Sequence, residues 1–119
     1  MKRDMDLLRQ ILVQVEDHPF DMGMVELRFD GRSKAEIAYH VKLAQQAGLV
    51  EAIDLSTSNG PDIRPTSLTW HGHEFLEAAR DETRWKKAKS IMKKKGGGMA
   101  FEVLQKLLTE LMLNNVLPV

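Results

Sequence analysis

Seven cations gather in residues 84–95, and no acidic residue lies among them. The rest of the chain is correspondingly acidic, because Lys plus Arg and Asp plus Glu both total 17. A basic stretch can bind the phosphates of nucleic acid by releasing their counterions. It can equally be the solvated face of a helix, where lysines stabilise the negative C-terminal end. Both interpretations stay open for this stretch, which comprises Arg84, Lys86, Lys87, Lys89, Lys93, Lys94 and Lys95.

A helix is predicted for residues 33–47, and its outer face is a second candidate for DNA contact. Ser33 and Glu36 form a capping-box pattern, and Gly48 can end the helix. A helix fits the major groove, where polar side chains reach base edges. A plain solvent face is the alternative, because Glu36 would repel phosphate. The predicted contacts are Tyr39, His40, Lys42 and Gln46, with Arg64 of the following hairpin placed to reach a phosphate or the minor groove.

We expect neither a metal site nor a catalytic group. The chain has no cysteine, and His71 and His73, two residues apart on a predicted helix, would point about 200° apart. His40 has no serine, cysteine or carboxylate partner at a spacing that suggests catalysis. The glycines at 96–98 lack the strand and the Gly-Lys-Ser or Gly-Lys-Thr of a phosphate loop. The sequence therefore predicts a protein that is not an enzyme and needs no cofactor.

Two further patterns precede the helix at 33–47. Apolar residues spaced by three and four predict a first helix over residues 5–15, with Asp4 at its positive end and Pro19 beyond its last turn. Residues 25–29 alternate apolar and polar side chains, which predicts a strand. Too little helical pattern lies between residues 15 and 33 for the scaffold helix of an ordinary helix-turn-helix.

After residue 48 the patterns predict a hairpin and then a helix. The hairpin strands are expected at 49–55 and 67–70, on either side of a long tip. Thr69 can cap a helix whose inward positions continue through Met92. Together with the preceding elements, these predict a mainly α fold with a small β-hairpin, of the α+β class.

A last helix is predicted for residues 99–113, after the glycines have broken the helical pattern. Its apolar seam must be buried against its own chain or against a second copy, so a homodimer through this helix is an open expectation. We predict a domain over residues 1–95, a hinge at 96–98 and a C-terminal helix and tail over 99–119. The seam comprises Phe101, Leu104, Leu108 and Leu111, flanked by Val103 and Leu107.

Composition places the chain among globular proteins, with 43% hydrophobic and 29% charged residues. The absence of cysteine fits a reducing cytoplasm. The first residues lack the apolar stretch of a signal peptide, and no apolar run approaches membrane-spanning length. We therefore expect a cytoplasmic protein without a membrane association.

Two stretches resemble bacterial winged-helix repressors. His40 to Val50 is similar to their recognition helix and first wing strand, and Leu68-Thr69-Trp70-His71-Gly72 to their second wing strand and next helix. Nearly the whole chain resembles an uncharacterised bacterial and prophage family of small proteins, classed as a domain of unknown function. The residues that carry this second resemblance are 1–8, 37–40, 46–49, 68–76, 78–81 and 101–104. It implies a winged-helix-like domain with a C-terminal helical extension and a phage or prophage origin.

These observations support two hypotheses of function. The first is a DNA-binding regulator of the winged-helix type, with the helix at 33–47 and the wing at the duplex and the lysines on phosphates. The second is a non-enzymatic interaction module, in which Tyr39, Leu43 and neighbouring apolar groups bind a host or phage protein. Net neutrality and the missing scaffold helix favour the second.

Overall fold

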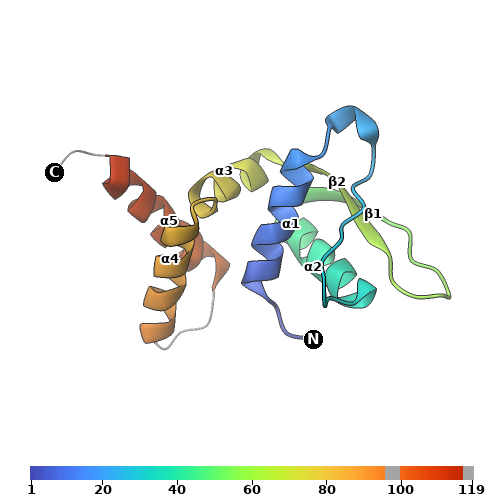
Figure 1. Cartoon of the computed structure of the whole chain (residues 1–119), viewed down its shortest axis with the longest axis horizontal. Coiled ribbons are helices and arrows are strands. Elements are labelled where there is room, and N and C mark those ends of the chain that lie inside the picture. The colour runs from blue at the N-terminus through green and yellow to red at the C-terminus, as the bar shows by residue number, and fades with distance from the viewer. Residues whose placement is uncertain (96–99, 117–119) are drawn as a thin grey trace. The chain divides into compact units, whose positions relative to one another are not determined.

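The computed structural model describes residues 1–95 and 100–116 (Figure 1). Within these ranges the chain forms five α-helices, one short 3₁₀ helix and a two-stranded antiparallel sheet. The predicted α+β class, mainly α with a small β-hairpin, is confirmed. The chain divides into two compact units, Met1–Glu74 and Phe75–Val119. The boundary therefore follows residue 74, whereas we had expected it at the glycines, and the predicted hinge at 96–98 lies outside the described residues.

The core of the first unit is built on α1 (Met5–Asp17), whose single apolar stripe is buried along the helix. Asp4 begins the helix, because its carboxylate accepts the Leu7 N–H at 3.1 Å. α1 packs against α2 (Lys34–Gln46) and β2 (Ile63–Leu68) (Figure 1). The first predicted helix and its inward face are confirmed. The central cluster of this core consists of Leu7, Ile11, Val15, Val25 and Val41.

The connection between α1 and α2 contains one short helix, η1 (Phe20–Met22), and otherwise extended chain. This agrees with the expectation that no full scaffold helix precedes α2. The segment leaves two apolar side chains in solvent, since Phe20 is 88% and Met22 67% exposed.

Residues 25–29 are extended but form no regular strand, so that prediction is wrong. Their one described backbone bond to the sheet runs from the Val25 N–H to the Pro65 C=O at 2.8 Å. Pro65 has no N–H to donate in return, and a ladder therefore does not develop. The two-residue alternation is confirmed, because Val25 is buried, Leu27 and Phe29 are half-buried, and the residues between them are exposed.

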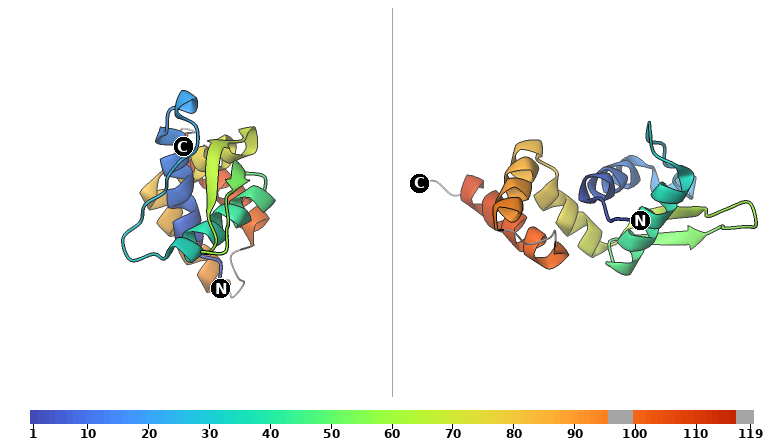
Figure 2. Two further views of the ribbon diagram at one scale, coloured as in Figure 1. Left: turned by 90° about the vertical axis from the view of Figure 1, so that its right-hand side faces the viewer. Right: turned by 90° about the horizontal axis from the view of Figure 1, so that it is seen from below.

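β1 (Val50–Asp54) and β2 form a hairpin that projects from the first unit (Figure 2). Val50 pairs with Leu68 and Asp54 with Ile63, with an irregularity after Glu51. The returning strand begins at Ile63, earlier than predicted, although it contains Pro65. In a strand, the C=O and the N–H of one residue point to the same side. The Pro65 C=O points toward Val25, so the missing N–H of this proline removes no hydrogen bond to β1.

α3 (Trp70–Ala79) starts in close contact with the turn that ends α2. The Thr69 hydroxyl accepts the Gly72 N–H at 3.0 Å and donates to the Gly48 C=O, so the predicted cap is confirmed. A Cβ at Gly72 would lie 2.0 Å from the Leu49 carbonyl oxygen. Only glycine therefore allows the start of α3 to come this close to the Leu49 backbone. Trp70 was predicted to end the returning strand, but it begins α3.

The second unit contains α4 (Glu82–Lys94), which packs on α5 (Phe101–Val116). The prediction of one helix from Thr69 through Met92 is wrong, because Asp81 starts a new helix by accepting the Arg84 N–H at 2.7 Å. The inward positions of α4 are as predicted, with Trp85 and Met92 buried.

The apolar seam of α5 is partly used inside its own chain. Leu104 and Leu108 are fully buried, and the Phe101 ring lies 4.8 Å from the Phe75 ring. Val103 and Leu113 remain 54% and 51% exposed. The residues that would form the centre of a dimer seam thus contact their own unit, and dimerisation stays a prediction.

Candidate nucleic-acid interface

The outer face of α2 is polar and only weakly charged. Lys42 and Gln46 are exposed, and Tyr39 is half-buried. The Ser33 hydroxyl accepts the Glu36 N–H at 3.0 Å, which confirms the predicted cap, and the Glu36 carboxylate lies 3.1 Å from the Arg32 guanidinium. Arg32 also contacts the Asp4 carboxylate at 2.9 Å, so it offsets only part of the negative charge that would oppose a phosphate at this face.

His40 is fully buried, and the prediction that it meets DNA is wrong. Its Nε2 accepts the Asp4 N–H at 2.8 Å, and its Nδ1 lies 2.8 Å from the Glu36 C=O. Because Nε2 is the acceptor, we assign the ring proton to Nδ1, which donates to Glu36. The side chain therefore joins the start of α1 to α2 and has no surface left for a base.

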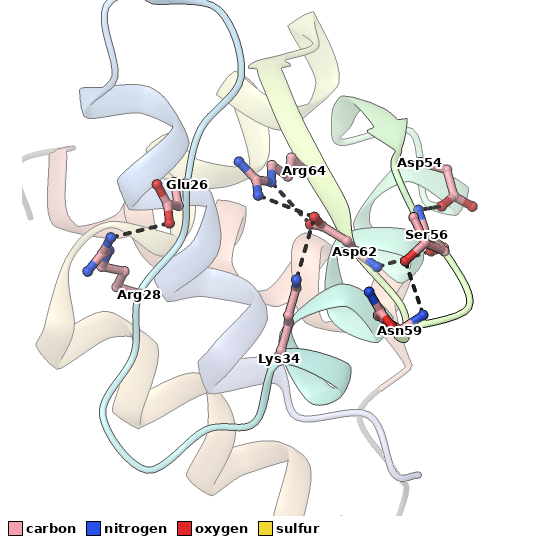
Figure 3. Close-up of polar contacts among 9 residues, drawn as sticks. Glu26, Arg28, Lys34, Asp54, Ser56, Asn59, Asp62 and Arg64 are labelled. Atoms are coloured by element: carbon pink, nitrogen blue, oxygen red, sulfur yellow. Dashed lines mark hydrogen bonds and ion pairs between the residues drawn. The ribbon is translucent and has the colours of Figure 1, made fainter.

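Arg64 of β2 lies against Asp62 and not at the hairpin tip (Figure 3). Its Nε and Nη2 donate to the two Asp62 carboxylate oxygens at 3.1 and 3.2 Å, and Lys34 Nζ lies 3.6 Å from the same group. The Arg64 guanidinium holds the pKa of the Asp62 carboxyl below its ordinary value, and Asp62 raises the pKa of Arg64. This pairing leaves Arg64 poorly placed to neutralise a phosphate.

Arg84 is engaged in local structure at the start of α4. Its Nε donates to the Ala78 C=O at 2.7 Å and its Nη2 to the Glu77 C=O at 3.1 Å. These are among the last carbonyls of α3, which have no partner within the helix. Arg84 thus caps α3 across the break between the two helices, and its role as a phosphate contact is not favoured by this geometry.

The remaining lysines of α4 form a coherent exposed face. Lys86, Lys87, Lys93 and Lys94 are all exposed, opposite the buried stripe of Trp85, Ala88 and Met92. Lys86 has one exposed partner, Glu82, at 3.8 Å, and such pairs contribute little. The fourth predicted contact of this helix, Lys89, is half-buried with its Nζ 5.9 Å from the centre of the Trp85 ring.

Charge is divided unequally between the two units. Residues 1–74 carry 8 Lys and Arg against 12 Asp and Glu, for a net charge of −4. Residues 75–119 carry 9 against 5, for a net charge of +4. The net charge of the whole chain is therefore zero although the second unit is basic, and most cations of that unit lie on α4.

Sequence reasoning missed Asp62, which pairs with Arg64 at the loop end of the hairpin, and Lys34, which contacts the same carboxylate. The spacing of Asp62 and Arg64 was an available signal, since residues two apart on a strand share a face. Within residues 1–95 and 100–116, no three His, Asp or Glu side chains are arranged to hold a metal ion. Nor does any helix in these ranges have the length and apolar character needed to cross a membrane.

Comparison with known proteins gives matches to sequences of undefined activity. The family described as "Hypothetical protein (DUF2513)" matches residues 2–98. A Haemophilus influenzae protein described as "Uncharacterized protein" is 36% identical over 108 residues, which cover 90% of this chain and 92% of that protein. No solved structure matches significantly. The resemblance to a family without an assigned function is thereby confirmed.

Proposed function

The chain belongs to the DUF2513 family of hypothetical proteins, and we propose that it binds double-stranded DNA through the exposed lysines of α4. The observation that carries this proposal is the face formed by Lys86, Lys87, Lys93 and Lys94 on a unit of net charge +4. The contacts are made to phosphates and do not depend on base sequence.

The spacing of these lysines suits a phosphate chain. Lys86 and Lys93, and likewise Lys87 and Lys94, are seven residues apart, which is about 10.5 Å along a helix. Duplex DNA carries one charge per about 1.7 Å of its axis, so several phosphates lie within reach of such a face. Glu82, in the first turn, is the acidic residue of the helix.

The element order of helix, hairpin and helix supports a winged-helix-like domain, in which α2 takes the part of the recognition helix. We extend the proposal to a non-catalytic, cytoplasmic regulator of phage or prophage origin, in which Tyr39, Lys42 and Gln46 meet the duplex after α4 has bound it. The burial of His40 and the pairing of Arg64 leave this face few cations of its own. Affinity therefore comes mainly from α4.

The test is a triple variant, Lys87→Gln, Lys93→Gln and Lys94→Gln, titrated onto a labelled duplex and followed by fluorescence anisotropy. Each lost phosphate contact reduces the slope of log K against log salt by about 0.9, so the triple variant should lose about 2.7. Lys86 and Lys89 are kept, because their contacts with Glu82 and Trp85 belong to the helix itself.

A matched control removes the same charge from first-unit positions that the proposal does not place on the duplex, through Lys2→Gln, Arg28→Gln and Lys34→Gln. The control should keep most of the wild-type slope. If the control loses the slope and the α4 variant keeps it, DNA is bound by the first unit and the assignment to α4 is wrong. If neither variant nor wild type binds, DNA binding itself is contradicted.

A protein-interaction module is the second candidate, and the exposed apolar groups of the first unit favour it. Ile53 and Leu55 are 45% and 38% exposed next to α2, in a unit of net charge −4. Tyr39 and Leu43, on the outer face of α2, are both half-buried. This function predicts a complex with a host or phage protein that survives nuclease treatment and is lost on Tyr39→Ala with Leu43→Ala.

A further inference from the structure

A cavity of about 380 Å³ lies in the first unit between the extended segment 25–30, the start of α2 and the start of β2. Its origin is the single bond between Val25 and Pro65. Beyond that bond the segment leaves β2, so that Leu27 and Phe29 line one wall and Ile63 the other. Figure 3 shows the polar groups around this space: Arg64 and Lys34 meet at Asp62, and Arg28 pairs with Glu26 on the segment.

The floor of the cavity is apolar. Leu27, Phe29, Ile37 and Ile63 are half-buried and pack against the central cluster of the core. Each leaves apolar surface toward the cavity, and covering that surface with an apolar group is favourable. A ligand that fills this space needs an apolar body.

At the rim two cations share one carboxylate, because Arg64 and Lys34 both contact Asp62, whereas Arg32 is already paired with Asp4 and Glu36. Four of the 8 Lys and Arg residues in positions 1–74 line the cavity, against three carboxylates. The N-terminus of α2 adds its partial positive charge at the same place. The cations are Arg28, Arg32, Lys34 and Arg64, and the carboxylates are Glu26, Asp30 and Asp62.

Two of these cations are held weakly by the protein. The Lys34 side chain is 71% exposed and lies 3.6 Å from Asp62, which Arg64 already satisfies through two hydrogen bonds. The Arg28 side chain is 83% exposed, and its partner Glu26 is also exposed. Exposed pairs of this kind are worth little, so an incoming anion can take either cation at small cost.

We propose that this cavity binds a small amphipathic carboxylate, with an aromatic or branched aliphatic body on the apolar floor and its carboxylate at Lys34. The site shares no residue with the DNA contacts proposed for α4 and α2. It adjoins the loop end of the hairpin, where the backbone C=O of Asp62 accepts the Leu55 N–H at 2.7 Å and the Asp62 N–H donates to the Ser56 hydroxyl at 3.0 Å. Lys34 contacts the side chain of this same residue.

The test uses 2-naphthoate as the probe and ¹H–¹⁵N NMR spectra of the full chain. Saturable shifts are expected at the amides of the lining residues, with a Kd in the millimolar range for a ligand of this size. The neutral analogue 2-naphthylmethanol should bind at least fivefold more weakly. Lys34→Gln should weaken naphthoate binding by a similar factor, while the same change at Lys42, on α2 but outside the cavity, should alter it less than twofold.

The same spectra show whether each variant is folded, so a loss of binding is not confused with a loss of structure. Equal binding of acid and alcohol would overturn the assignment of an anion site. Equal weakening by Lys34→Gln and Lys42→Gln would do the same, because it would show general attraction to positive charge. Shifts that spread over the first unit, or no saturation, would remove the cavity as a site.

Discussion

The burial of His40 leads to the most specific stability prediction, for the variant His40→Ala. The change leaves the Asp4 N–H and the Glu36 C=O without the partners that now lie at 2.8 Å. Each partly buried polar group left unpaired costs about 1–1.5 kcal/mol, at the low end of the usual range. The emptied space of a fully buried ring adds about 1 kcal/mol. The free energy of unfolding should therefore fall by about 3 kcal/mol.

Urea unfolding followed by far-UV circular dichroism measures this loss. With a slope of about 1.5 kcal/mol per molar urea, the midpoint should fall by about 2 M. Lys42→Ala is the control, because Lys42 is exposed on the same helix and should change stability by less than about 0.5 kcal/mol. If His40→Ala lowers the free energy of unfolding by less than about 1 kcal/mol, the two hydrogen bonds by which the His40 ring joins the start of α1 to α2 are refuted.

Three further changes test other parts of the fold. Gly72→Ala should lower the free energy of unfolding by at least about 3 kcal/mol, because the added Cβ would lie 2.0 Å from the Leu49 carbonyl oxygen. An unchanged melting temperature would contradict that close approach. The lowered pKa of Asp62 stabilises the fold above the carboxyl's ordinary pKa of 3.8, and this contribution is lost as the pH falls through the folded-state pKa. Asp62→Asn should thus melt earlier than wild type at pH 7, the difference should shrink as the pH falls below 3.8, and a difference that grows in acid would reverse the sign. Arg84→Gln should cost about 1–2 kcal/mol through the uncapped end of α3 yet leave the DNA salt slope nearly unchanged, and a loss of about 0.9, one full phosphate contact, would return Arg84 to the interface.

The parts of the fold that follow local rules could be predicted from sequence. Asp4, Ser33 and Thr69 each cap the helix that follows, as their side chains suggest. Gly48, with φ of 76°, takes the left-handed conformation that ends α2. These features depend on residues within a few positions of each other, so the sequence contains the whole cause.

His40 was misplaced because polarity was given more weight than spacing. It stands three residues after Ile37 and four before Ala44, both of which face inward, so the helical period alone puts it on the same side. What makes its burial favourable is the Asp4 amide, 36 positions earlier in the chain. A partner at that distance is a property of the fold, and the sequence pattern does not show it.

The break between α3 and α4 and the pairing at Asp62 have the same kind of cause. Residues 80–84 are all polar, which a solvent-facing helical turn also allows, and the Asp81 cap with the return of Arg84 onto α3 separates the helices. Lys34 reaches Asp62 because α2 and β2 pack together. The cavity depends in turn on the hydrogen bond from the Val25 N–H to the Pro65 C=O. These residues are far apart in the chain, so no local sequence pattern predicts this bond.

The central claim, that the protein holds duplex DNA by phosphate contacts, is tested most directly by titrating wild-type protein onto a labelled random-sequence duplex at 50 and 200 mM salt. Four lysine contacts from α4 predict a slope near −3.6, which is a loss of affinity of about a hundredfold over this fourfold rise. Tight binding that does not change with salt would contradict phosphate contacts. No binding at 50 mM would contradict DNA binding altogether and would leave the interaction module as the function to pursue.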